Sequence, residues 1–157
     1  MFTGQTPLAL DGKGRLAIPA RLRERLQALC GGHLVVTADP TSGCLLLYPA
    51  PEWQVVSARI NGLSSLDPFA KQLKMLVIGS AEELEPDASG RILISSLLRR
   101  FAKLEKNVVL VGQGEKFAIW DDAAWQGQFE QAAQMPQLLA AAAREGTLSE
   151  ELKGFSL

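Results

Sequence analysis

Short apolar runs and helical apolar patterns divide the chain into two similar series of elements. The first series predicts strands at 2–10 and 16–18, a helix at 20–29, and a hairpin of strands at 33–37 and 44–48. Leu22, Leu26 and Leu29 share one face of that helix, so we expect this face to lie in the core. The second series predicts a strand at 92–94, a short helix and a hairpin that ends at Trp120.

Helical patterns also lie between and after the two series. A helix beginning at Pro51 and another beginning at Asp67-Pro68 each have an apolar side, which includes Phe69 in the second. After Trp120, the pattern predicts a helix capped by Asp121 or Asp122, a break at Pro136 and an alanine-rich helix at 138–144. We therefore divide the chain into a first half (1–50), linking helices (51–79), a second half (80–122), and C-terminal helices with a tail (123–157), and we assign no function to residues 136–157.

The stretch 11–23 recurs as 87–99, which indicates a duplication with an offset of 76 residues. Six of the thirteen paired positions are identical. These are Asp11/Asp87, Gly14/Gly90, Arg15/Arg91, Ile18/Ile94, Leu22/Leu98 and Arg23/Arg99. Each half has too few strands to bury a sheet face alone. We therefore predict an α+β fold in which two β-α-β-β units interleave into one small β-barrel with helices outside it.

Each copy of the repeat has the chemistry of a turn followed by an exposed arginine. The aspartate bonds to its own backbone, and the glycine supplies a positive φ, so Asp11, Gly14, Asp87 and Gly90 are expected to shape the two turns. Arginine pairs bidentately with phosphate or with guanine in the major groove. An ion pair with Asp11 or Asp87 is the alternative role for Arg15 or Arg91, and the two roles are compatible.

These motifs resemble the MraZ family of bacterial transcriptional regulators, whose fold is similar to the AbrB-type swapped-hairpin barrel. That family carries a D-x-x-x-R motif twice, each followed by a strand and a helix, and this chain has Asp11…Arg15 and Asp87…Arg91. The resemblance also rests on Met1-Phe2-x-Gly4, Gly12-Lys13-Gly14-Arg15-Leu16-x-Ile18-Pro19, Leu46-Leu47-Tyr48-Pro49-x-Pro51-x-Trp53, Val109-Leu110-Val111-Gly112 and Phe117-x-x-Trp120. The chain departs from the family at Ser95-Ser96, where proline usually precedes the second helix, and Ser89 stands opposite Lys13.

The resemblance implies a cytoplasmic, nucleoid-associated regulator that binds short direct repeats in double-stranded DNA, upstream of division and cell-wall genes. It also implies ring-like homo-oligomers. With the motifs and their flanking charges, it makes seven residues candidate DNA contacts. These are Lys13, Arg15, Arg21, Arg23, Arg25, Arg91 and Arg99.

Charge distribution agrees with this hypothesis better than total charge does, since the net charge is −1. Residues 11–25 carry five basic side chains against two acidic ones, and 99–106 carry four against one. Local positive potential is what attracts phosphate. Residues 121–157 carry six acidic side chains against two basic ones, so the positive charge is concentrated after the two motifs.

Other chemistry has little support in the sequence. The chain has no long apolar run that predicts a membrane span, and Cys30 and Cys44 lack metal-ligand spacing, so we predict no metal, cofactor or small-molecule substrate. His33 has no partner that would make it catalytic, and no nucleophile–base pair can be assembled. A non-enzyme is therefore expected, and an oligomeric protein-interaction scaffold without DNA binding is the alternative function.

Overall fold

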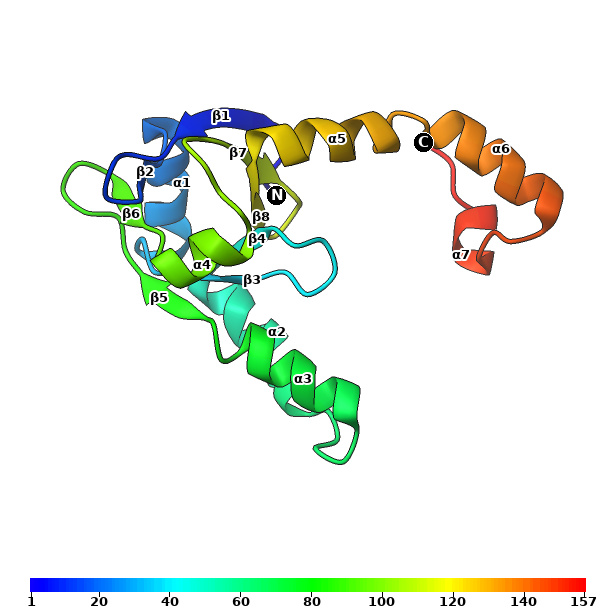
Figure 1. Ribbon diagram of the computed structural model, residues 1–157, viewed down its shortest axis with the longest axis horizontal. Coiled ribbons are helices and arrows are strands. Elements are labelled where there is room, and N and C mark those ends of the chain that lie inside the picture. Colours follow the sequence, from blue (N-terminus) through cyan, green and yellow to red (C-terminus); the bar gives the residue numbers. More distant parts are fainter. The chain divides into compact units, whose positions relative to one another are not determined.

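The computed structural model describes residues 1–157, which form two compact units, 1–122 and 123–157 (Figure 1). In the first unit the order strand, strand, helix, strand, strand occurs twice, and two helices connect the two occurrences. The elements are β1 (Gln5–Ala9), β2 (Arg15–Ala17), α1 (Ala20–Cys30), β3 (Leu34–Ala38), β4 (Leu45–Pro49), α2 (Ala50–Asn61), α3 (Pro68–Val77), β5 (Glu82–Leu84), β6 (Arg91–Leu93), α4 (Ser96–Phe101), β7 (Asn107–Gly112) and β8 (Phe117–Asp121). The α+β class expected from the sequence is confirmed.

The strands of the two halves pair with one another. All pairs are antiparallel, in a six-stranded sheet of order β1-β7-β8-β4-β3-β5 and a two-stranded ribbon of β2 and β6. Thus β1 of the first half lies beside β7 of the second, and β5 of the second lies beside β3 of the first. The strands β4 and β8, which close the two hairpins, join at the centre of the larger sheet.

The register of these pairs follows the duplication. Leu16 lies opposite Ile92 at the centre of the ribbon, and these residues are equivalent positions of the repeat. Backbone bonds extend the ribbon symmetrically, since Ile18 N donates to Gly90 O and Ile94 N donates to Gly14 O, both at 2.9 Å. Each motif is therefore held by the strand that follows the other motif.

The core lies between the larger sheet, the ribbon and the two helices that follow the ribbon strands. Leu16 and Ile92 are fully buried, as are Leu26 of α1 and Leu98 of α4. Leu22 packs partly against this core, whereas Leu29 is 56% exposed, so the expectation that Leu29 faces the core is wrong. Leu29 falls in the last turn of α1, which ends at Cys30, and Leu26 is the residue of this helix that the core buries.

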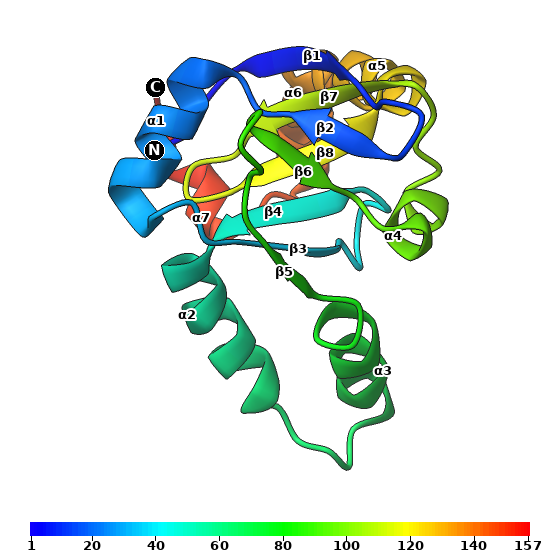
Figure 2. The same cartoon turned by 90° about the vertical axis from the view of Figure 1, so that its left-hand side faces the viewer.

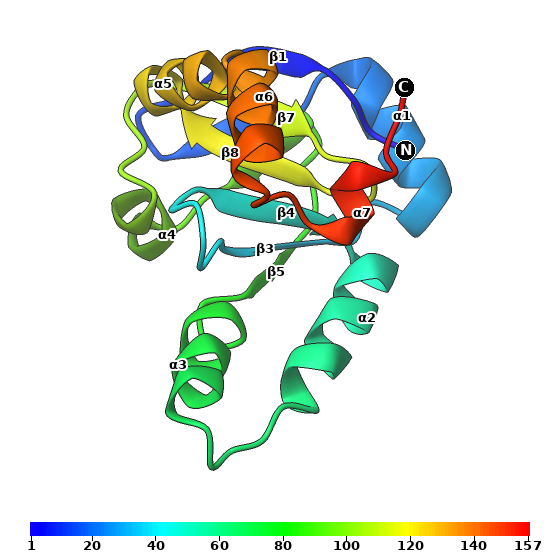
Figure 3. The same cartoon turned by 90° about the vertical axis from the view of Figure 1, so that its right-hand side faces the viewer.

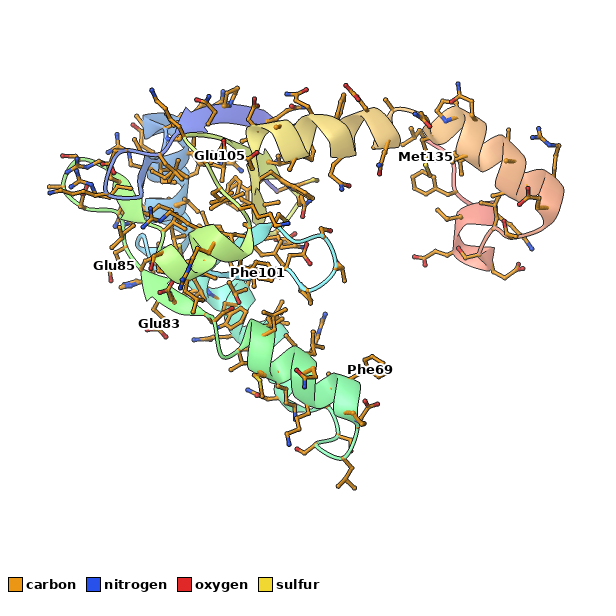
Figure 4. The ribbon with its side chains drawn as sticks, in the orientation of Figure 1. Phe69, Glu83, Glu85, Phe101, Glu105 and Met135 are labelled. Carbon is orange, nitrogen blue, oxygen red and sulfur yellow. The ribbon has the colours of Figure 1, made fainter.

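The hairpin of α2 and α3 joins the two halves (Figure 3). Asp67 caps α3 as predicted, with Oδ1 accepting from the backbone N–H groups of Phe69 and Ala70. The far end of α3 is tied to the sheet by Thr37 of β3, whose buried hydroxyl donates to Val77 O at 2.5 Å. Phe69, predicted on the apolar side of α3, is instead 87% exposed and stands away from the helix (Figure 4).

Two short elements were not predicted. β5 comprises Glu82–Leu84 and forms the edge of the larger sheet by pairing with β3. The helix α7 (Glu150–Lys153) is capped by Ser149. The rest of the second unit consists of the remainder of α5 (Asp122–Ala132) and α6 (Met135–Glu145), and Pro136 lies in the first turn of α6. None of the helices combines the length and apolar character needed to cross a bilayer.

Candidate nucleic-acid interface

The first motif forms a turn whose centre is the Asp11 carboxylate. Its Oδ1 accepts from the backbone N–H groups of Lys13 and Arg15, both at 2.9 Å, and Oδ2 accepts from Arg15 Nε at 2.7 Å. Gly14 closes the turn with a φ of +82°, which side chains other than hydrogen rarely tolerate. The aspartate thus holds both the turn and the arginine, and Arg15 takes part in the ion pair that was one of its two expected roles.

These contacts stabilise the ionised form of Asp11. The hydrogen bond from the backbone N–H of Arg15 is the strongest influence, and the Arg15 guanidinium and the Lys13 N–H act in the same direction. Together they lower the pKa of Asp11 from 3.8 to about 2. The carboxylate therefore stays charged across the whole physiological range.

The second motif repeats this geometry. Asp87 Oδ1 accepts from the backbone N–H groups of Ser89 and Arg91 at 2.9 Å, and Oδ2 accepts from Arg91 Nε at 3.1 Å. Gly90 has a φ of +76°. The backbone bond from Arg91 is again the main cause of a lowered pKa at Asp87. The two turns differ at two exposed positions, where Gly12 and Lys13 of the first correspond to Ala88 and Ser89 of the second.

The ribbon places both motif arginines on one face. Arg15 lies opposite Leu93, and Ala17 lies opposite Arg91, while the buried Leu16–Ile92 pair points the other way. The outer face therefore presents Arg15 and Arg91 at diagonal positions, with Ala17 and Leu93 exposed between them. Figure 2 looks onto this side of the unit, where the two turns lie at opposite ends of the ribbon.

Both arginines keep donors that the protein does not use. The bonds to Asp11 and Asp87 involve Nε, and the terminal amino groups Nη1 and Nη2 make no hydrogen bond within the protein. The side chains of Arg15 and Arg91 are about one-third exposed, at 29% and 34%. An arginine held this way can offer its end to a pair of acceptors without a large loss of rotamer freedom.

The remaining predicted contacts fall into two groups. Arg21 and Arg25 are exposed on α1, where Arg25 also donates to Met1 O and lies over the Phe2 ring. Arg23 of α1 and Arg99 of α4 are half-buried, and their Nε atoms donate to Ile18 O and Ile94 O at 3.0 Å. Sequence spacing did not distinguish these groups.

An acidic edge lies beside the second motif. Glu83 of β5 and Glu85 after it are exposed and point away from the unit (Figure 4). His33 Nδ1 lies 2.6 Å from Glu85 Oε1, so the single histidine belongs to this edge. No group of three or more histidine, cysteine, aspartate or glutamate side chains is arranged to hold a metal ion.

Two exposed apolar residues of the interface, Ala17 and Leu93, were not predicted from the sequence. The signal was available in the strand period, because residues on either side of a buried strand residue must point outward. The apolar run 92–94 predicts a strand but does not indicate that Leu93, which is 58% exposed, points outward. Its position between two arginines distinguishes it from a core leucine.

The duplicated strand–turn–strand–helix unit, with its two halves interleaved, defines a small α+β fold with internal symmetry, and comparison with known proteins identifies the family. The family model described as "MraZ protein, putative antitoxin-like" matches twice, at residues 1–76 and 77–147. These two matches agree with the duplication read from residues 11–23 and 87–99. The chain belongs to the MraZ family.

Full-length relatives agree with this assignment. The chain is 51% identical to a protein of Nitrosomonas europaea and 52% identical to one of Nitrosomonas eutropha, and each is named "Transcriptional regulator MraZ". A protein of the same name from Pseudomonas aeruginosa is 43% identical. Each comparison covers 157 residues and all of both chains. The family consists of transcriptional regulators and not of enzymes, which confirms the expectation of a non-enzyme.

Proposed function

We propose that the protein is a sequence-specific transcriptional regulator that binds double-stranded DNA with the face formed by its ribbon and two turns. The observation that carries the proposal is the β2–β6 register, which brings Arg15 and Arg91 from distant motifs onto one exposed face. The names of the relatives support a regulatory role. The structure adds a surface with the chemistry for that role.

The dimensions of this face suit the major groove. A two-stranded ribbon fits within it. Diagonal neighbours in an antiparallel pair are roughly 7–8 Å apart, and somewhat closer at Cβ. Two base-pair steps rise by about 6.8 Å, at about 3.4 Å each. Arg15 and Arg91 can therefore reach bases about two steps apart, and their terminal amino groups match the O6 and N7 acceptors of guanine. Ala17 and Leu93 offer apolar contacts of the kind that thymine methyl groups accept.

Neighbouring cations add affinity without selectivity. Lys13 is exposed at the tip of the first turn, and Arg21 and Arg25 are exposed on α1. In our proposal these side chains contact phosphates. A single subunit offers few such contacts, so several linked subunits are needed for tight binding to repeated sites.

We further propose assembly into ring-like homo-oligomers on direct promoter repeats, as the family resemblance implies. The exposed apolar side chains of the α2–α3 hairpin support self-association. Phe69 is 87% exposed and Met75 is 63% exposed. Nucleoid association in the cytoplasm and control of division and cell-wall genes belong to the same proposal. Light scattering should report an oligomer at micromolar protein concentration, and a monomer would contradict this part.

The interleaved strand pairing supports a finer description of the fold. We propose that residues 1–50 and 80–122 are two AbrB-like halves, which together form a swapped-hairpin, double-split barrel. Residues 51–79 then act as the linking helices, and 123–157 as a C-terminal extension. The pairing of β1 with β7 and of β5 with β3, each between the two halves, supports this description.

A fluorescence-anisotropy titration against random duplex DNA at two salt concentrations tests the proposal. We expect binding that weakens steeply as salt rises, because phosphate contacts release counterions. The alternative is an oligomeric scaffold, which the near-neutral net charge and exposed hairpin favour. Selection from a randomised duplex library separates the two, since a regulator enriches a defined sequence and a scaffold enriches none.

A further inference from the structure

Arg23 and Arg99 occupy equivalent places in the duplication, and each reaches across to the other half. A Cβ placed on Gly14 would lie 2.6 Å from Cζ of Arg99, and a Cβ placed on Gly90 would lie 2.4 Å from Cζ of Arg23. Each guanidinium therefore lies against the bare backbone of a turn glycine. Arg99, on the helix after the second motif, covers the turn that carries Arg15, and Arg23 covers the turn that carries Arg91.

The backbone around each guanidinium makes the arrangement specific. Arg99 Nε donates to Ile94 O, and the N–H of the same Ile94 donates to Gly14 O. Arg23 Nε donates to Ile18 O, and the N–H of Ile18 donates to Gly90 O. One residue thus links the arginine and the turn glycine at each end of the ribbon. In Figure 2, α4 lies near the β1–β2 turn and α1 near the β5–β6 turn.

The geometry points to Arg23 and Arg99 as positioning residues that set the shape of the opposite half's turn. We propose that Arg99 positions the turn of Lys13 and Arg15, and that Arg23 positions the turn of Arg91. This inference rests on the proposed DNA contacts of those turns. It assigns the two half-buried arginines an indirect effect on DNA binding, in place of the direct phosphate contact expected from their charge.

Physical chemistry favours the positioning role. A planar guanidinium can lie flat on a glycine backbone while its Nε keeps a fixed hydrogen bond, whereas an ammonium has no plane and no Nε. Both glycines are buried with positive φ, so the turn has no side chain of its own to fix its position at that point. The guanidinium fills that place and limits the conformations open to the turn.

Double-mutant cycles can test this role because the pairing crosses between halves. Arg99→Ala should weaken binding to a selected duplex about as much as Arg15→Ala does. The variant that combines Arg15→Ala with Arg99→Ala should have an affinity no more than about twofold below that of either single variant. Arg99→Ala combined with Arg91→Ala should lose the product of the single effects, because those residues act at different turns. Arg100→Ala, an exposed position on the same helix, is the matched control.

Two further readouts distinguish positioning from direct contact. Arg99→Lys keeps the positive charge but lacks the planar guanidinium. This variant should therefore bind DNA as weakly as Arg99→Ala, with the same salt dependence as wild type. A lysine that restores binding would indicate a phosphate contact and overturn the inference. Circular dichroism establishes whether each variant is folded. If Arg99→Ala does not fold, Arg99→Lys takes its place in the double-mutant cycles.

A measurement without DNA separates this inference from the proposed function. In ¹⁵N–¹H spectra, Arg99→Lys should shift the amide signals of Lys13 and Gly14 and leave those of Ser89 and Gly90 in place, and Arg23→Lys should do the reverse. Unchanged signals at the opposite turn would refute the positioning role. If these shifts occur while Arg15→Ala binds DNA like wild type, the positioning role stands and the proposed DNA contact is wrong.

Discussion

Arg15→Ala should reduce affinity for the selected duplex more than affinity for random DNA. The substitution removes the two terminal amino groups that the protein leaves unbonded, while Asp11 can still hold the turn through the backbone N–H groups of residues 13 and 15. One bidentate contact to a base is worth roughly 1–3 kcal/mol of discrimination. The ratio of specific to random affinity should therefore fall roughly 5- to 150-fold.

Two other substitutions, Lys13→Ala and Arg91→Ala, serve as comparisons for Arg15→Ala. Lys13→Ala removes an exposed ammonium, so it should weaken both duplexes alike and reduce the salt slope by about 0.9 for each phosphate that the lysine neutralises. Arg91→Ala should cost less than Arg15→Ala. Its turn has Ser89 at the tip, and Glu83 and Glu85 are exposed nearby in the chain, where they repel phosphate.

The assay is a set of anisotropy curves for wild type and the three alanine variants, on the selected and random duplexes at two salt concentrations. Circular dichroism verifies that each variant is folded. A folded Arg15→Ala variant that binds like wild type, beside an Arg91→Ala variant that does not, would show that the DNA-facing motif lies in the other half. Equal losses on both duplexes would mean that Arg15 contacts phosphate instead of a base.

Three further outcomes can be measured on the protein without DNA. Thr37→Val leaves the buried Val77 carbonyl without its hydrogen-bond donor, so the free energy of unfolding should fall by about 1–3 kcal/mol. In thermal melts each kcal/mol corresponds to a loss of roughly 2–4 °C in Tm. Because the pKa of Asp11 is lower in the folded protein, the unfolded chain binds more protons in acid, and stability should decline as the pH falls from about 4 to about 2. Thermal melts of Asp11→Asn should show a shallower decline over the same range. Burial raises the pKa of the Cys44 thiol to about 12, so iodoacetamide at pH 8 should modify the half-buried Cys30 first, as mass spectrometry of digests would show.

Local chemistry in the sequence was enough to predict the elements that position the interface. The Asp–Gly spacing predicted both turns, and their geometry now includes the Asp11–Arg15 and Asp87–Arg91 pairs. A cap residue was equally informative at α3, which begins directly after Asp67 as expected. These features depend on residues a few positions apart, so spacing alone carries them.

Features that depend on distant residues were harder to predict. β5 is a three-residue strand with the polar composition of a solvated loop, and only its pairing with β3 makes it a strand. The places of Arg23 and Arg99 depend on a turn from the other copy of the repeat, which no local pattern encodes. Phe69 followed the helical period but lies near the tip of the hairpin, where no sheet surface reaches.

The interleaved pairing also affects how the chain is made. β1 leaves the ribosome early, but its partner is β7, and Gln5 lies opposite Val111. At about 5–20 residues per second, the interval between their syntheses is on the order of 5–20 s. During that time β1 and the β3–β4 hairpin have unpaired edges, which bind other strands readily. Co-translational chaperones that cover these edges should therefore raise the yield of native protein more than they would for a fold built from consecutive hairpins.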